Sequence, residues 1–152
     1  MFKIFSPRVA RRTEAFAFNT TLTRLTPWLV PGKFGVTLDR LAAGVPDWSG
    51  GTRIGESLAA FVSGYQHRVL DASAVVLILS DGLDRGEPEV LVHAMRAIHG
   101  RARRLIWLNP LLGDPRYRPL ARGMEAALPF VDHFASAHNL ESLERLVGIL
   151  AA

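Results

Sequence analysis

Hydrophobic and polar residues recur along the chain with two different periods, and the change of period predicts strands and helices in turn. The continuous aliphatic run Ser73–Ser80 predicts a strand that is buried on both faces. Arg104–Leu108 predicts a second buried strand, which Asn109 and Pro110 end. The segment between the two strands has Pro88 in the first turn of a helical pattern, where proline is well tolerated. This order of strand, helix and strand favours a parallel pair of strands, because a crossover helix joins such a pair.

The remaining patterns continue this alternation on both sides of those strands. Thr13–Phe18 and Thr21–Thr26 alternate and predict a hairpin that turns at Asn19 and Thr20. Met1–Thr13 has several basic residues and no acidic residue, and it is expected to be the frayed end of a helix. The other expected elements are helices over Thr37–Val45, Ile54–Tyr65 and Arg118–Leu128, a strand over Phe130–Phe134 and a last helix capped by Asn139. Residues 1–152 are thus expected to form a single α/β domain with a mostly parallel sheet.

Composition excludes several classes of protein. Hydrophobic residues make up 49% of the 152 positions and charged residues 21%, which suits a packed core. The chain has no cysteine, so a disulfide framework, a cysteine-ligated zinc site and a thiol nucleophile are excluded. The longest apolar run, Ala74–Leu79, is too short to span a membrane, and we expect a cytoplasmic protein.

The charge of the chain, +4 with a pI of about 10.3, raises the question of nucleic-acid binding. Acidic and basic residues are interleaved, and the one dense basic cluster consists of Arg101, Arg103 and Arg104. This cluster lies between a predicted helix and a predicted strand, where cations suit the C-terminal end of the helix dipole. We therefore expect no nucleic-acid partner.

Polar residues next to the predicted strands are the candidates for chemistry, because ligands of α/β sheets bind beyond the carboxyl ends of the strands. Asp81 directly follows Ser73–Ser80, where it either binds a hard cation or starts a turn. Thr52 follows two glycines at the start of a predicted helix. It either caps the N-terminus of that helix or presents its hydroxyl to an ion, and the two roles are compatible. Asp47 and Ser49 share the loop of Thr52 and are weaker candidates for the same spot.

Motifs of nucleotide-binding and hydrolytic enzymes are missing from the sequence. Gly50–Gly55 lacks the glycine spacing and the preceding strand of a dinucleotide-binding fingerprint, and neither a Walker motif nor a nucleophile elbow is present. The five histidines are scattered without metal-ligand spacing and are expected to be structural or solvated. Asp84, Arg85 and Glu87 predict a solvated loop. Trp48 is expected to cover the core, and an exposed partner-binding anchor is the alternative.

Five stretches of the sequence together resemble the CoxE-like family of von Willebrand factor A (VWA) domains. They are TEAFAFNTTLTRLTP (13–27), DWSGGTRIGESL (47–58), LILSDGLDRGEPEVL (77–91), RRLIWLNPLLGDPRYRPLARGM (103–124) and HNLESLERL (138–146). The resemblance covers nearly the whole chain from Thr13 onward. It implies a three-layer, Rossmann-like fold with an ion site at the top of the sheet.

The ion site of such domains takes an aspartate and two serines from a DxSxS motif, a threonine from a second loop and an aspartate from a third. By resemblance, Thr52 matches the threonine and Asp81 matches the last aspartate. Such a site binds Mg²⁺ or Mn²⁺. The chain has no DxSxS, since Asp71–Val75 (DASAV) leads into a strand instead of leaving one. We therefore expect an incomplete site with weak or absent metal binding.

The resemblance also implies that the first, central strand is missing and that the domain is truncated at its N-terminus, with Met1–Arg12 as the tail of the first helix. The missing strand would lie between Thr13–Phe18 and Ser73–Ser80. Those two strands are then expected to pair with each other, or another chain fills the gap, or the sequence is a fragment with a misassigned start.

Three functions follow as hypotheses. The resemblance implies a non-enzymatic, metal-ion-dependent binding module that acts with a MoxR-type AAA+ ATPase on a client metalloenzyme, notably in maturation of carbon monoxide dehydrogenase. A degenerate, metal-free scaffold or a gene fragment is the first alternative. The second is a phosphotransfer or hydrolytic α/β enzyme that uses Asp81, for which a second convergent carboxylate is needed.

Overall fold

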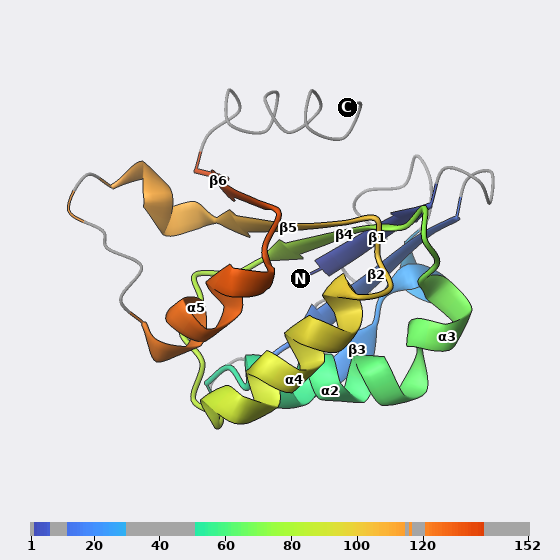
Figure 1. The fold of residues 1–152 in the computed structure, drawn as a ribbon, viewed down its shortest axis with the longest axis horizontal. Helices are drawn as coiled ribbons and strands as arrows, with labels where there is room; N and C mark the ends of the chain where they lie inside the picture. The colour runs from blue at the N-terminus through green and yellow to red at the C-terminus, as the bar shows by residue number, and fades with distance from the viewer. Residues whose placement is uncertain (1, 7–11, 30–50, 115, 117–120, 139–152) are drawn as a thin grey trace.

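The computed structural model describes residues 2–6, 12–29, 51–114, 116 and 121–138, which form a six-stranded sheet with helices packed on it (Figure 1). The strands are β1 (Phe2–Ser6), β2 (Arg12–Phe18), β3 (Leu22–Arg24), β4 (Val75–Leu79), β5 (Arg104–Asn109) and β6 (His133–Ser136). The α-helices are α2 (Ile54–Gly64), α3 (Gln66–Val69), α4 (Pro88–His99) and α5 (Arg122–Ala127). Short 3₁₀ helices cover Thr26–Trp28, Pro110–Gly113 and Leu128–Phe130.

The sheet has the strand order β3-β2-β1-β4-β5-β6. β4, β5 and β6 are parallel to one another, whereas β1 is antiparallel to both β2 and β4, and β3 is antiparallel to β2. β2 and β4 consequently run in the same direction, and so do four of the six strands. The predicted α/β class is confirmed, and so are the hairpin at Asn19 and the parallel pair on either side of α4.

The first strand corrects the sequence analysis, which predicted the frayed end of a helix over Met1–Thr13 and a vacant central position. Instead, β1 fills the position between β2 and β4, with Ile4 opposite Glu14 on one side and Val76 on the other. The physical reason is that β2 and β4 carry backbone N–H and C=O groups in the middle of the sheet, which need partners. A strand satisfies both edges, whereas a helix satisfies neither.

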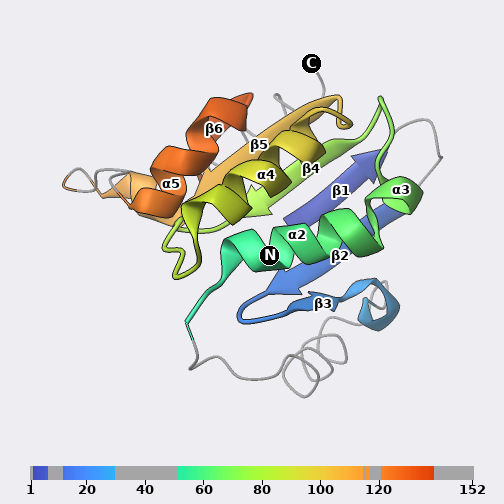
Figure 2. The ribbon, with the colours of Figure 1, turned by 60° about the horizontal axis from the view of Figure 1, so that its bottom comes forward.

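The main hydrophobic core lies between the sheet and the described α-helices, which all cover the same face (Figure 2). α2 and α4 pack against each other and bury Leu58 and Phe61 from one helix and Leu91 and Met95 from the other. Phe61 meets Phe16 of β2 edge to face, with 5.3 Å between ring centroids. These apolar positions recur at helical spacing, which is why the sequence pattern predicted both helices correctly.

A second, smaller cluster lies on the other face of the sheet and includes buried Val75, Ile106 and Leu108. The continuous apolar runs of β4 and β5 thus supply side chains to both faces, as expected for strands in the middle of a layered fold. The helices predicted over Thr37–Val45 and after Asn139 lie outside the described residues. The third layer of the predicted fold therefore stays a prediction.

Two element boundaries near the C-terminal end of the described chain differ from the sequence prediction. The helix predicted over Arg118–Leu128 is α5, Arg122–Ala127, and residues 117–120 are outside the described ranges. The strand predicted over Phe130–Phe134 begins later, as β6, because Pro129 lies in the 3₁₀ turn that follows α5. A proline suits the first turn of such a helix and has no N–H for a strand ladder. None of the described helices is long and apolar enough to cross a membrane.

A proline substitution at Ile4 tests the central position of β1. Ile4→Pro removes one N–H from a strand that is paired on both sides, so that a buried carbonyl loses its donor. We expect it to lower the free energy of unfolding by about 2 kcal/mol or more, measured by urea denaturation. Ile4→Val keeps the N–H and the strand preference and is expected to cost about 1 kcal/mol. Equal, small effects of both substitutions would contradict a central strand and favour a frayed terminus.

Candidate functional site

The candidate site lies at the edge of the sheet where β4 and β5 end. We call this edge the carboxyl rim and define it as Gly51–Arg53 before α2, Ser80–Gly86 after β4, and Asn109–Gly113, which begins with the last residue of β5. The two strands are parallel, and the register pairs Leu79 with Leu108, so their following loops leave the sheet side by side. This is the edge at which ligands of open α/β sheets bind.

Asp84 ties the rim together. Its Oδ1 accepts hydrogen bonds from the backbone N–H of Ile54 at 2.8 Å and of Gly86 at 3.0 Å, and its Oδ2 accepts one from Gly55 at 3.2 Å. The first two N–H groups of α2 are thereby satisfied by a carboxylate 30 positions further along the chain. A negative charge at the N-terminal end of a helix also interacts favourably with the positive end of the helix dipole.

This arrangement corrects the prediction that Asp84 belongs to a solvated loop. Asp84 is half-buried, whereas Arg85 and Glu87 are exposed, as predicted. The backbone N–H of Arg85 also donates to the carbonyl oxygen of Thr52 at 3.0 Å. The loop that carries Thr52 and the loop that carries Asp81 are therefore joined directly.

Thr52 does not cap α2, contrary to one of its two predicted roles. The helix begins at Ile54 with Arg53 at the N-cap position, and the Arg53 side chain makes no capping hydrogen bond. Asp84 performs that function instead. The second predicted role of Thr52, a hydroxyl presented to an ion, stays a prediction.

Asp81 starts a turn, which was one of its two predicted roles. Its Oδ1 accepts the backbone N–H of Leu83 at 3.0 Å, which forms an Asx turn. Its carbonyl oxygen accepts the side-chain amide of Asn109 at 3.2 Å. The Asx turn and the ion-binding role are compatible, and the second stays a prediction.

Asn109 is the rim residue that the sequence analysis did not recognise as functional. It is fully buried, and its amide donates to the carbonyl of Asp81 while its Oδ1 accepts the N–H of Leu111 at 2.8 Å. One side chain thus fixes the loops after both parallel strands. The signal in the sequence was a polar residue at the end of a buried strand and before Pro110, where it caps the 3₁₀ turn.

Close packing holds the β4 loop in place behind these hydrogen bonds. Gly82 has φ of +81°, and a Cβ there would lie 2.9 Å from Sδ of Met124. Gly123, the neighbour of Met124 on α5, lies so close that a Cβ would come within 2.7 Å of Cβ of Asp84. The left-handed backbone at Gly82 favours glycine. At Gly123 the close contact with Asp84 leaves no room for a larger residue.

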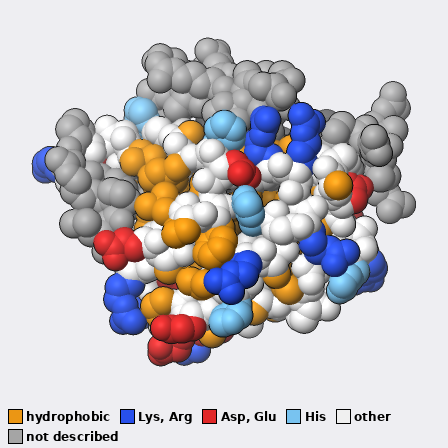
Figure 3. All heavy atoms as spheres, in the orientation of Figure 1, with side chains coloured by type: hydrophobic (Ala, Val, Ile, Leu, Met, Phe, Trp, Pro, Cys, Tyr) orange, Lys and Arg blue, Asp and Glu red, His pale blue; other side chains and the backbone are white. Residues whose placement is uncertain are grey.

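The outer surface of the rim carries exposed leucines. Leu83 is 57% exposed and Leu111 is 39% exposed. Leu83 lies two residues after Asp81 and Leu111 two residues after Asn109, and Asp81 and Asn109 are hydrogen-bonded to each other. Both side chains project from turns whose backbone is fixed by hydrogen bonds. Figure 3 shows further hydrophobic side chains gathered over α5 and the adjoining surface, with acidic and basic side chains dispersed around them. Such a surface suits contact with another protein.

The acidic and histidine side chains of the described residues form no cluster for a metal ion. Within the described ranges, no group of three or more His, Cys, Asp or Glu side chains is arranged to hold a metal ion. Both oxygens of Asp84 accept backbone N–H groups. Asp114 is paired with Arg116, whose hydrogen bonds lower the pKa of that carboxyl. Asp47 and Ser49 lie outside the described residues. Mg²⁺ usually keeps several waters and needs few protein ligands, so the metal-binding roles of Thr52 and Asp81 stay predictions.

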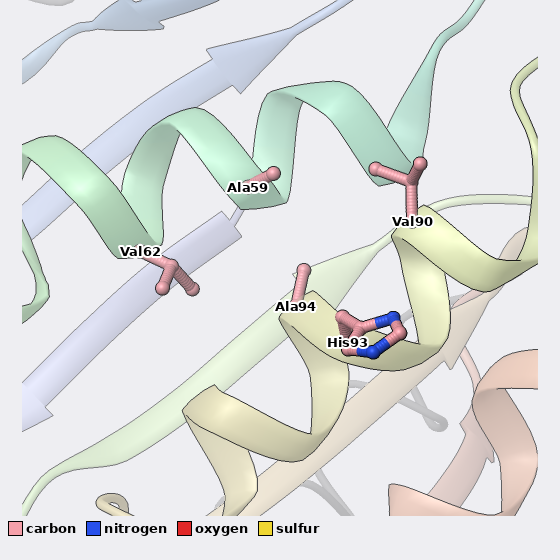
Figure 4. A pocket seen from close by; sticks show the side chains of 5 residues that line it. All are labelled: Ala59, Val62, Val90, His93 and Ala94. Atoms are coloured by element: carbon pink, nitrogen blue, oxygen red, sulfur yellow. The ribbon is translucent and has the colours of Figure 1, made fainter.

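An open groove between α2 and α4 lies on the helical layer (Figure 4). Its volume is about 300 Å³, and its lining consists of Ala59, Val62, Val90, His93 and Ala94. The ring nitrogen Nδ1 of His93 donates to the carbonyl oxygen of Glu89 on the same helix at 2.7 Å. No second titratable side chain lines the groove, so it has no pair of groups for acid–base catalysis.

Comparison with known proteins identifies the family. The family model described as VWA domain containing CoxE-like protein matches residues 6–143, which is most of the chain. No curated protein and no solved structure matches the chain. The mixed α/β sheet agrees with the Rossmann-like fold of that family.

Replacement of Asp84 tests its function as the tie between the β4 loop and α2. Asp84→Ala leaves three backbone N–H groups without their acceptor and is expected to lower the free energy of unfolding by about 2 kcal/mol. The measurement is urea denaturation followed by circular dichroism. Asp114→Ala is the matched control, because Asp114 is an acidic loop residue bonded to nearby Arg116, and its effect is expected to stay within about 0.5 kcal/mol. Equal stability of the two variants would contradict the tie.

Proposed function

Because the chain belongs to the family of VWA domains containing CoxE-like proteins, we propose that it is a protein-binding module that works with a MoxR-type AAA+ ATPase. The family suggests a protein-interaction module and is generally non-catalytic. The proposed client is a metalloenzyme of the carbon monoxide dehydrogenase type, whose maturation the pair would assist in the cytoplasm. No catalytic step is assigned to the chain.

The observation that carries this proposal is the rigid, apolar surface of the carboxyl rim. Leu83 and Leu111 are exposed to solvent on turns fixed by Asp81 and Asn109. Exposed side chains on a fixed backbone lose little conformational freedom when a partner binds, and this favours association. Burial of both leucines in a partner would contribute about 25 cal/mol for each Å² removed from water.

We also propose an incomplete ion site. Thr52 and Asp81 are proposed as the two remaining ligand positions, with Ser49 and Asp47 as weaker candidates. Because the sequence has no DxSxS motif and the described residues contain no cluster of three or more His, Cys, Asp or Glu side chains, we propose that Mg²⁺ or Mn²⁺ binding is weak or absent. Partner binding would then depend on apolar contact and not on a bridging metal ion.

A metal-free scaffold is the second candidate function, and the missing DxSxS motif favours it. An enzyme that uses Asp81 has less support. The carboxylate nearest to Asp81 in the loop, Asp84, is engaged by three backbone N–H groups and is not available as a general acid or base.

Titration calorimetry with Mg²⁺ tests the incomplete ion site. We expect a dissociation constant weaker than about 1 mM for the chain, which corresponds to about 4 kcal/mol of binding free energy or less. The double variant Thr52→Ala, Asp81→Ala is expected to give the same weak signal, and Asp114→Ala serves as the control for removal of a carboxylate outside the rim. Micromolar affinity that disappears in the double variant would overturn the prediction and restore metal-dependent binding.

A binding assay with the MoxR-type ATPase of the same organism tests the apolar rim. Leu83→Asp with Leu111→Asp places two charges on the proposed contact surface, and we expect affinity to fall at least about tenfold, or about 1.4 kcal/mol. The matched control is Leu29→Asp, because Leu29 is 37% exposed and lies outside the rim. Surface plasmon resonance with EDTA present provides the measurement. Unchanged affinity of the rim variant, or equal loss in the Leu29 variant, would contradict the proposed surface.

A further inference from the structure

The central strand of the sheet is contributed by a segment that the family match barely includes. The match begins at Ser6, which is the last residue of β1. β1 nevertheless occupies the middle of the sheet and pairs along its length with β2, and along most of it with β4. The part of the chain that matches the family thus presents two strands with facing edges, and β1 closes the gap between them.

The flanking strands make a vacant gap costly. Phe16 of β2 and Val76 and Ile78 of β4 are fully buried, so their backbone groups have no access to water when the sheet is intact. Without β1, these edges would expose unpaired N–H and C=O groups and apolar side chains. A strand is therefore expected to fill this position in the folded protein, and the contacts of β1 are the same whichever copy supplies it.

We infer that β1 can be exchanged between two copies of this chain, so that Phe2–Ser6 of each copy pairs with β2 and β4 of the other. β1 precedes the other strands in chain order, and its principal contacts with other elements are with β2 and β4. Its exchange therefore needs no rearrangement among the remaining five strands. The exchanged dimer has the same strand pairs as the monomer, which is the usual basis of domain swapping.

The length of the connection limits how two exchanging copies can be arranged. Five residues, numbers 7–11, separate β1 from β2. An extended chain of that length spans up to about 17 Å, so the start of β2 in one copy must lie within about that distance of the β1 position in the other. Within one copy the tethered strand has a high effective concentration, in the millimolar range for short connections. The exchanged dimer is therefore expected to increase with protein concentration.

Disulfide trapping between two variants detects the exchange, because the natural chain has no cysteine. The register places Lys3 opposite Ala15 on β2 and opposite Leu77 on β4. Paired residues in antiparallel strands lie within the range of distances that a disulfide spans. Lys3→Cys and Ala15→Cys are introduced in separate full-length chains, which are mixed at high concentration and oxidised. We expect a covalent heterodimer whose yield rises several-fold with protein concentration.

Two further variants serve as controls. Ser63→Cys places the thiol on an exposed helical position, where random collision is easier than at buried Ala15, and its heterodimer with Lys3→Cys is expected to be several-fold less abundant. Lys3→Cys with Ala15→Cys in one chain is expected to close an intramolecular disulfide and to remain monomeric. That result confirms the register and blocks exchange.

A second trap keeps the test valid if the Ala15 variant does not fold. Leu77→Cys lies on the opposite side of β1, is only half-buried and pairs with Lys3 in the same register. Heterodimers with Cys at position 15 or 77 above the Ser63 control support the exchange. Yields at both positions that do not exceed that control overturn it, as does failure of the intramolecular disulfide to form.

Discussion

The structure depends on the pairing of one strand with two neighbours that run in the same direction. β2 and β4 each present an edge toward the middle of the sheet, and the apolar residues that flank these edges are buried under α2 and α4. β1 satisfies both edges at once in antiparallel register. Removal of this pairing would divide the sheet into a β2–β3 hairpin and a separate β4–β5–β6 unit.

The carboxyl rim takes its shape from a few polar contacts built on that sheet. Asp84 connects the β4 loop to the start of α2, and Asn109 connects the same loop to the turn after β5. Because these bonds use backbone groups, the rim can vary its outward side chains without losing its form. The fold thus separates the residues that build the rim from those, such as Leu83 and Leu111, that a partner would meet.

The sequence predicted the elements with strong periodicity and missed those that depend on distant residues. β4, α4 and β5 followed from long apolar patterns with clear ends, which are local signals. β1 was missed because five residues beside a basic segment have no decisive period, and its strand form depends on edges that lie far along the chain. The tie between Asp84 and α2 spans 30 positions, and no local spacing predicts it. Asn109 had a local signal as a cap, but its bond to the carbonyl of Asp81 follows only from the parallel register.

The lengths of the strands have a consequence for the behaviour of the molecule at high concentration. The two outermost strands, β3 and β6, are the shortest strands of the described sheet, with three and four residues. Short borders of this kind offer few open backbone groups to a neighbouring molecule, which is a recognised protection against fibre growth. Continuous sheet extension, the usual path to insoluble aggregates, is therefore disfavoured at both borders by the architecture itself.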